Sequence, residues 1–208
     1  MSGLTSLSKT TVAVNLALAL SAAGRRVGLV DADLYGPDIP RMMGLRRQAA
    51  AASVTVYSGK RGARLEAVDR YGVQQLVFGQ RGRKVIVVVV VTPQVVAQQD
   101  VRRLVADLGR HPALAVGGIE NMAGFTCPCC GTTTPLFPAA PDGESIWAQV
   151  SKLASIPFSP KAAADADEGR PVMVTRSVAE QVAAYESAAA QLQPFLDDEG
   201  SPDSIDMK

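Results

Sequence analysis

Aromatic residues and net charge are both scarce in this chain, and each scarcity excludes a class of function. Aromatic side chains make up 5% of the 208 residues, too few for the stacking platforms that bind single-stranded nucleic acids. The formal net charge is +1 and 47% of the residues are hydrophobic, which excludes a disordered polyampholyte and a strongly basic nucleic-acid binder. We therefore expect a folded protein with no nucleic-acid partner.

Long hydrophobic runs are also missing. The longest aliphatic run covers residues 85–91, far short of the roughly 18 residues of a membrane-spanning helix, so we expect no membrane span. The charge, apolar stretch and small residues at the start of the chain are also those of a secretory signal. Asn15 interrupts that stretch, however, and residues 25–33 continue as a turn and a buried strand, which favours a part of the fold.

Cysteine is limited to three residues in one cluster, Cys127, Cys129 and Cys130. An odd number of neighbouring cysteines cannot form a disulfide framework. The cluster indicates metal or redox chemistry in a reducing compartment.

Patterns of strands and helices alternate along most of the chain. Residues 85–92 are β-branched and uninterrupted, which is typical of a central parallel strand, and residues 113–119 form a second strand. Helices are predicted at residues 10–23, 94–108, 146–154 and 177–195. Shorter strands or extended segments are predicted at residues 27–30, 71–78 and 170–174. The alternation predicts an α/β fold with a mostly parallel sheet and helices on both faces.

Two segments stand apart from this alternation. Residues 41–84 are rich in Lys and Arg without a helical stripe, which favours a solvated insertion. Residues 196–208 are acidic and predict a disordered tail that follows a single domain over residues 1–195.

Residues 3–10 nearly fit the phosphate-binding pattern G-x-x-x-x-G-K-[ST]. In that pattern backbone N–H groups cradle phosphates, the lysine adds charge and the hydroxyl residue binds Mg²⁺. Gly3, Lys9 and Thr10 fit, whereas Ser8 replaces the second glycine and should weaken the approach of the backbone to phosphate. The following helix still offers its N-terminus to an anion. The alternative is a lysine near a helix start with Thr10 as the N-cap.

Asp31 and Asp33 follow the strand predicted at residues 27–30, where open α/β sheets place ligand-binding groups. An acidic pair at that place can hold Mg²⁺ through water and orient an attacking water. A polar turn capped by Asp33 is the alternative.

Several short segments carry a resemblance when they are taken together, at residues 9–20, 26–37, 39–42, 92–94, 119–122, 127–131 and 167–172. The most specific are Asp-Ala-Asp-Leu-Tyr-Gly-Pro at residues 31–37 and the Glu-Asn-Met that precedes Cys-Pro-Cys-Cys. In this order they resemble the Mrp/ApbC/Nbp family. Its members are P-loop ATPases of the ParA/MinD-like, deviant Walker A group that carry iron–sulfur clusters for delivery to apoproteins.

The resemblance implies a three-layer P-loop NTPase-like fold with a site for ATP and Mg²⁺. Lys9 resembles the phosphate-binding lysine, Thr10 the Mg²⁺ ligand, Asp33 the acid near the attacking water and Asn121 the residue that hydrogen-bonds adenine. Lys9 and Asp33 would thus be the catalytic residues. The implied nucleotide-binding residues are Gly3, Ser8, Lys9, Thr10, Thr11 and Asn121.

Two departures from the family pattern predict weak or absent ATP hydrolysis. Leu4 stands where the deviant loop carries a lysine that reaches the partner's nucleotide. The family's Asp-x-Pro-Pro-Gly-Thr-Gly-Asp switch has no counterpart, because residues 71–79 lead almost directly into residues 85–92. Since only two residues precede Gly3, we expect the fold to lack its first strand as well as the switch II strand.

Cys127 and Cys130 form a C-x-x-C pair, which supplies half of a four-sulfur metal site. A symmetric homodimer would supply the other half, with both pairs meeting at the two-fold axis around a [4Fe–4S] cluster. Such an exposed, shared cluster is labile, which suits a carrier. A zinc-bridged structural dimer and a redox dithiol are the alternatives.

These patterns predict an ATP-binding carrier or scaffold that assembles a [4Fe–4S] cluster as a homodimer and transfers it to recipient apoproteins. The expected compartment is the cytoplasm or the mitochondrial matrix. One alternative is a hydrolysis-deficient dimer that binds zinc or an iron–sulfur cluster. Another is a ParA/MinD-like positioning ATPase, which does not account for Cys127 and Cys130.

Overall fold

The computed structural model of the chain describes residues 3–25, 27–29, 38–44, 69–70, 73–74, 85–108, 114–127, 129–130, 132–138 and 145–197. Asp31, Asp33, most of the basic segment at residues 41–84 and residues 198–208 of the predicted tail lie outside these ranges.

β5 (Leu114–Thr126) is the middle strand of the main sheet. β4 (Val85–Val91) pairs with it in parallel on one side, and β7 (Ser151–Phe158) pairs in parallel on the other. At its carboxyl end β5 also pairs antiparallel with β6 (Thr133–Thr134), so that the segment between them forms a β-hairpin. Apart from this hairpin the main sheet is parallel, as predicted.

A second, smaller sheet contains β1 (Val27–Gly28), β3 (Val73–Gln74) and β2 (Asp69–Arg70) in that order. β1 is parallel to β3, and β2 is antiparallel to it. Among the strands that the structure describes, no pairing joins the two sheets.

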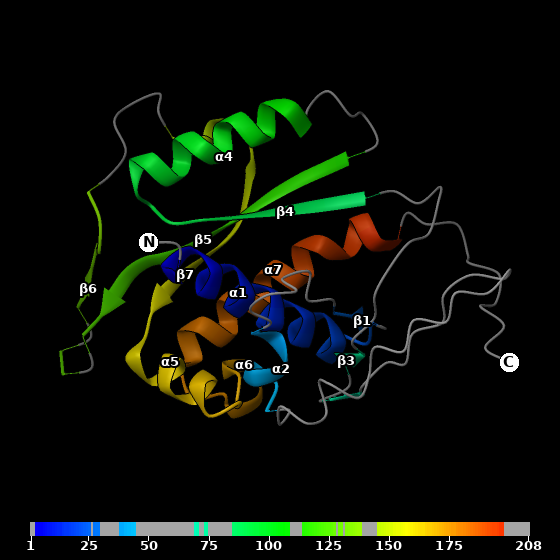
Figure 1. Cartoon of the computed structure of the whole chain (residues 1–208), viewed down its shortest axis with the longest axis vertical. Helices are drawn as coiled ribbons and strands as arrows, with labels where there is room; N and C mark the ends of the chain where they lie inside the picture. Colours follow the sequence, from blue (N-terminus) through cyan, green and yellow to red (C-terminus); the bar gives the residue numbers. More distant parts are fainter. Residues whose placement is uncertain are drawn as a thin grey trace, which may run out of the picture.

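Helices cover both faces of the main sheet and give three layers (Figure 1). α1 (Gly3–Ala22) and α7 (Ala179–Asp197) lie side by side on one face. α4 (Val95–Leu108) lies on the other face with the 3-10 turn η1 (Ile146–Ala148). Within the described ranges, no helix is long and apolar enough to cross a bilayer.

Three short helices pack beside α1 on the same side of the sheet: α2 (Ile39–Met42), α5 (Pro160–Asp167) and α6 (Val172–Thr175). α2 and α6 contact α1, and α5 contacts both of them. Gly44 and Gly169, with φ values of 69° and 72°, bring the ends of α2 and α5 so close together that a Cβ at Gly169 would overlap the backbone of Gly44.

β4 is apolar at every position because its valines alternate between two hydrophobic clusters. Val88 and Val90 pack against the larger cluster, to which α1, α7 and β7 contribute. Val87, Val89 and Val91 belong to or pack on the smaller cluster beneath α4 and η1. A parallel strand with helices on both faces needs no polar face, and each fully buried valine contributes roughly 1.5–3 kcal/mol.

Two adjacent glycines let side chains approach β5 closely from both faces. A Cβ on Gly118 would lie 2.5 Å from Cζ3 of Trp147, and a Cβ on Gly117 would lie 2.8 Å from Cδ1 of Leu153. Successive residues of a strand face opposite sides, so Gly118 makes room for η1 and Gly117 makes room for the larger cluster.

The helix predicted at residues 146–154 is wrong, because this segment forms η1 followed by β7. Ser145 caps η1, since its Oγ accepts a hydrogen bond from the N–H of Trp147 (3.3 Å). Ala148, Gln149 and residues 152–154 are good helix formers and favour a helix locally. Pairing with β5 and burial of Leu153 and Ile156 in the larger cluster favour the strand instead.

Three other predictions also differ from the structure, two in the boundary of an element and one in its type. α1 begins at Gly3, well before residue 10. β5 continues past residue 119 to Thr126, because its extension pairs with β7 and β6. Residues 172–175 form α6 where the sequence predicts an extended segment.

We expect Gly118→Ala to destabilise the fold by roughly 1–3 kcal/mol, the usual cost of inserting a methyl group into a well-packed site. The methyl group must displace the ring of Trp147. Urea unfolding followed by circular dichroism measures the loss. In a Trp147→Leu background the same substitution should cost less, and an equal cost in both backgrounds would contradict this explanation.

Candidate functional site

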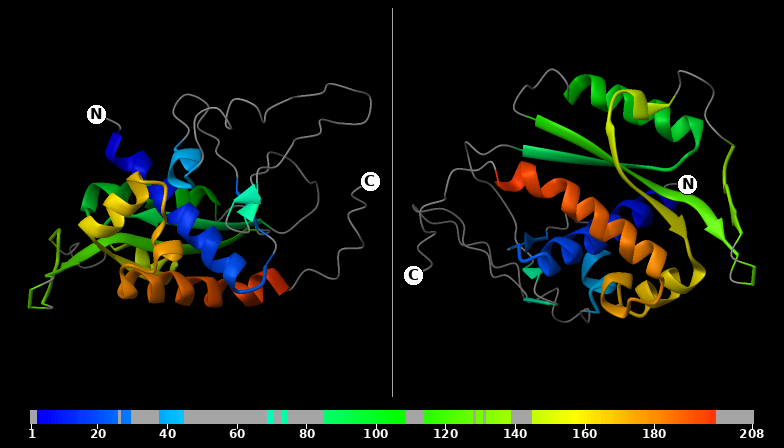
Figure 2. Two further views of the ribbon diagram at one scale, coloured as in Figure 1. Left: turned by 90° about the horizontal axis from the view of Figure 1, so that it is seen from below. Right: turned by 180° about the vertical axis from the view of Figure 1, so that it is seen from behind.

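The cysteine cluster forms the turn of the hairpin between β5 and β6. Figure 2 shows this hairpin projecting beyond the helical layers. The N–H of Cys127 donates to the carbonyl oxygen of Thr132 (2.9 Å), which closes the turn. Cys127 is half-buried, and Cys129 and Cys130 are exposed. The predicted metal ligands Cys127 and Cys130 therefore lie together in one accessible turn.

Hydrogen bonds lower the pKa of the Cys130 thiol below its ordinary value. The largest effect comes from the side chain of Thr132, whose Oγ1 lies 3.4 Å from Sγ of Cys130. The backbone of Thr132 and the thiol of Cys127 act in the same direction. A lower pKa raises the thiolate fraction, and the thiolate is the form that binds metals.

This turn supplies only part of a metal site. Among the residues that the structure describes, no group of three or more His, Cys, Asp and Glu side chains is placed to hold a metal ion. Structural zinc and cysteine-bound iron–sulfur clusters use four protein ligands. The donor set of Cys127 and Cys130 therefore fits half of such a site.

The base of the hairpin is held by residues that sequence reasoning missed. Oγ1 of Thr126 donates to Oε2 of Glu180 on α7 (3.0 Å) and lies 3.1 Å from Oγ1 of Thr133 on β6. The rings of Phe125 and Phe158, which pair across β5 and β7, have centroids 6.5 Å apart. No motif signals these contacts, because each joins segments that are distant in the sequence.

The predicted phosphate-binding segment is helical. The backbone of residues 3–8 forms the first turns of α1 where the sequence predicts a loop, and Lys9, Thr10 and Thr11 follow within the helix. Lys9 is exposed, and both threonines are half-buried. The alternative role of Thr10 as an N-cap is therefore wrong. The first four N–H groups of a helix have no intrahelical partner, so the start of α1 can still attract an anion.

Asn121 lies within β5 rather than after its end. Its side chain is 7% exposed, and Oδ1 accepts a hydrogen bond from the N–H of Met122 (3.0 Å). Met122 has a φ of 58°, and the register with β7 shifts between Asn121 and Phe125, so the strand is irregular there. The start of α1 and the carboxyl ends of β5 and β7 lie at the same end of the molecule (Figure 1). A role of Lys9, Thr10 and Asn121 in nucleotide binding stays a prediction.

Glu120 faces the opposite side of β5 from Asn121. Its carboxylate accepts hydrogen bonds from Nε1 of Trp147 (3.1 Å), Nζ of Lys152 (2.8 Å) and Oγ of Ser155 (3.0 Å). Nζ of Lys152 also lies 4.6 Å from the ring centroid of Trp147. Three donors compensate for the burial of Glu120 and tie η1 to β5 and β7, which indicates a structural role.

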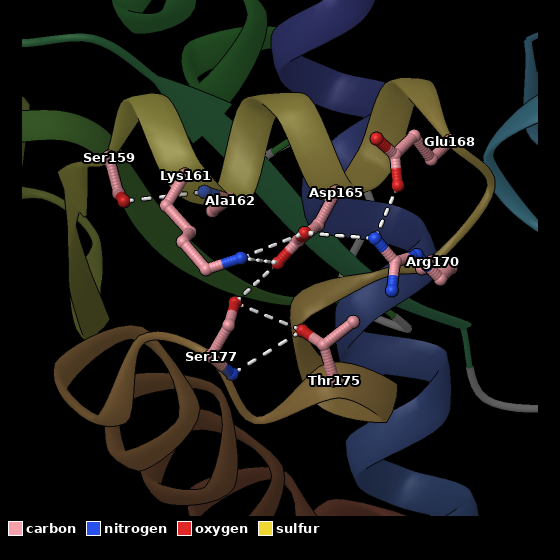
Figure 3. Close-up of polar contacts among 8 residues, drawn as sticks. All are labelled: Ser159, Lys161, Ala162, Asp165, Glu168, Arg170, Thr175 and Ser177. Atoms are coloured by element: carbon pink, nitrogen blue, oxygen red, sulfur yellow. Dashed lines mark hydrogen bonds and ion pairs between the residues drawn. The ribbon is translucent and has the colours of Figure 1, made fainter.

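Asp165 is the centre of a second polar cluster (Figure 3). Its side chain is 4% exposed and accepts hydrogen bonds from Oγ of Ser177 (2.6 Å) and from Nζ of Lys161 (3.1 and 3.2 Å). Nη2 of Arg170 lies 3.6 Å from Oδ1 of the same carboxylate. Asp165 thereby joins α5 to the segments on both sides of α6, including residues 167–172 of the family pattern.

A comparison with protein families identifies the family of this chain. The family described as NUBPL iron-transfer P-loop NTPase matches residues 1–67 and 71–193. The chain belongs to this family. The resemblance inferred from the sequence motifs is confirmed.

Two relatives of this chain have names that describe iron–sulfur cluster proteins. The Cytosolic Fe-S cluster assembly factor NUBP2 homolog of Trichoplax adhaerens is 29% identical, over 82% of this chain and 83% of that protein. The Iron-sulfur cluster carrier protein of Helicobacter pylori is 26% identical, over 94% of this chain and 66% of that protein. The chain thus spans just under two thirds of the bacterial relative.

A solved structure of another protein has a fold similar to that of this chain. The septum site-determining protein MinD of Pyrococcus horikoshii, complexed with Mg-ADP, superposes with a TM-score of 0.61. The sequence identity is 18%, and 91% of this chain and 92% of that protein are covered. The P-loop NTPase-like α/β fold predicted from the sequence is confirmed.

We expect Asp165→Asn to lower the melting temperature at pH 7. The hydrogen bond from Ser177, followed by that from Lys161, holds the pKa of Asp165 below its ordinary value. A carboxyl group with a lowered folded-state pKa stabilises the fold above its unfolded pKa, and this stabilisation is lost as the pH falls through the folded pKa. The difference between variant and parent should therefore shrink below about pH 4, where an unfolded aspartate becomes protonated.

Asp167→Asn is the control for this prediction. Asp167 lies on the same helix but is 71% exposed and pairs with Arg41 at the surface. Its replacement should change the melting temperature little at any pH. A loss for Asp165→Asn that stays constant from pH 7 to about pH 3 would contradict the role given to the carboxylate charge.

Proposed function

We propose that this chain carries an iron–sulfur cluster, which two copies hold jointly through Cys127 and Cys130 and which passes to recipient apoproteins. The observation that carries the proposal is the projecting turn in which these two thiols lie together. Membership of an iron-transfer family supports iron as the cargo. The names of the relatives, an Fe-S cluster assembly factor and an iron-sulfur cluster carrier protein, support the same cargo.

The homodimer follows from counting ligands. Each chain contributes two thiolates, whereas a [4Fe–4S] cluster takes four. Two copies related by a two-fold axis would bring equivalent turns together and complete the set. Because the turn projects from the body of the protein, two such turns can meet without a large interface between the helical layers.

For nucleotide, we propose that ATP and Mg²⁺ bind weakly at the start of α1, with Lys9 beside the phosphates and Thr10 beside the metal ion. The N-terminus of α1 and the exposed lysine suit an anion. The helical backbone of residues 3–8 supports weak binding, because N–H groups that a phosphate loop directs at its ligand are used within the helix from the second turn onwards.

The compartment that we propose is the cytoplasm or the mitochondrial matrix. All three cysteines are unpaired, and thiols in a projecting turn persist in a reducing environment. The name of the animal relative, a cytosolic factor, supports this assignment.

A second candidate, a hydrolysis-deficient dimer that holds zinc, shares the same thiols. Four-sulfur sites accept zinc as readily as iron, and the helical residues 3–8 favour a chain without nucleotide turnover. The two candidates differ in the metal that the dimer takes up when both are offered.

Anaerobic reconstitution with iron, sulfide and zinc separates these functions. We expect about four iron and four sulfide per dimer, a broad visible absorption band and a dimeric mass that depends on the cluster. Cys127→Ser and Cys130→Ser should each abolish the cluster. Cys129→Ser is the matched control in the same turn and should retain it.

The results have distinct meanings. Zinc bound in place of iron, without the visible band, would sink the carrier proposal and support the structural dimer. Loss of the cluster in Cys129→Ser but not in Cys127→Ser would show that the proposed assignment of the ligands is wrong. Transfer from the loaded dimer to an apoprotein with free cysteines, measured by the recipient's absorption, tests the delivery step.

ATP turnover provides a separate prediction. We expect phosphate release close to the background rate in the parent chain, because Leu4 replaces the signature lysine and residues 3–8 form no loop. Lys9→Ala should then leave the rate unchanged and weaken nucleotide binding, measured by calorimetry. A substantial turnover rate that disappears in Lys9→Ala would show that the site is a competent ATPase.

A further inference from the structure

Glu180 lies at the base of the cysteine hairpin although it is far from the cysteines in the sequence. Its Oε2 accepts the hydrogen bond from Oγ1 of Thr126, the residue before Cys127. A threonine hydroxyl has one hydrogen to donate. Because Thr126 donates to Glu180, the contact between Thr126 and Thr133 must be donated by Thr133. The three side chains form a directed series of hydrogen bonds from β6 through β5 to α7.

The residue after Glu180 fastens the same turn of α7 to the neighbouring strand. Gln181 is buried, and its Nε2 donates to the carbonyl oxygen of Pro157 at the end of β7 (2.7 Å). Pro157 precedes Phe158, whose ring contacts Phe125 at the base of the hairpin. One turn of α7 therefore holds the carboxyl ends of both β5 and β7.

α7 provides a firm support for these contacts. Tyr185, Ala188 and Ala189 are almost completely buried in the larger hydrophobic cluster. Tyr185 follows Glu180 by little more than one helical turn, so the core fixes the position of the first turn. The negative charge of Glu180 also suits the N-terminal turn of a helix.

We propose that Glu180 is a positioning residue for the cysteine turn. Its carboxylate anchors Thr126 and, through it, Thr133, which fixes the direction of the hairpin and the placement of Cys127 and Cys130. The purpose of this anchoring rests on the proposed function, in which two turns must meet around one cluster. The anchoring itself is a property of the metal-free chain and can be measured without any cluster.

The test compares the alkylation rates of Cys127 and Cys129 by iodoacetamide in the reduced, metal-free protein, resolved by peptide mass spectrometry. Cys127 is half-buried in the closed hairpin, whereas Cys129 is exposed and serves as the internal reference. We expect Glu180→Ala to raise the ratio of the two rates about fivefold, which corresponds to about 1 kcal/mol of local stabilisation. Glu180→Gln keeps an oxygen acceptor for Thr126 and should restore a ratio within about twofold of the parent.

Glu186→Ala is the matched control. Glu186 is an exposed carboxylate on the same helix, but its ion pair is with Arg176 (3.0 Å). Its removal should leave the ratio unchanged. An unchanged ratio in Glu180→Ala, or an equal rise in Glu186→Ala, would overturn the positioning role. Failure of the parent chain to bind a cluster would instead overturn the proposed function, while the alkylation comparison would still stand.

Discussion

The pairing of β5 with three other strands is the constraint on which both the core and the cysteine turn depend. β4 and β7 hold β5 in the centre of a parallel sheet, and its extension beyond Asn121 pairs with β6. Such a strand cannot slip by one residue, because the slip would move every side chain to the opposite face. The register that places Ile119 in the core therefore also determines where Thr126 and the cysteines emerge.

Three carboxylates, on β5, α5 and α7, differ in burial, and the difference separates their roles. Glu120 and Asp165 are largely removed from water, and each is surrounded by several donors that compensate for the lost hydration. Such groups hold elements together. Glu180 is exposed and accepts its hydrogen bond from a residue that adjoins the cysteine turn. An exposed contact adds little to the stability of the core, so the removal of Glu180 should affect the position of the hairpin rather than the fold.

Local patterns in the sequence are sufficient to predict the elements whose burial is uniform or periodic, such as β4, α4 and α7. They fail for β7, because this segment becomes a strand only through pairing with β5 and through the space above Gly117 and Gly118. The pair Cys127 and Cys130 is recognisable from its spacing alone. Thr126 and Glu180 are 54 residues apart, and no pattern in either segment predicts the contact between them. Asp33 lies outside the described residues, so its predicted role stays a prediction.

Under the proposed function, the small number of thiolates in each turn provides a route for transfer. A structural metal site surrounds its ion with four ligands from one folded unit and releases it only when that unit opens. A turn with two thiolates leaves half of the coordination to another molecule. A second copy of the chain can occupy that half during assembly, and the cysteines of a recipient can replace the second copy afterwards. The hairpin must then present its thiols in a fixed orientation to two different partners, and a fixed orientation is what the base formed by Thr126, Thr133 and Glu180 provides.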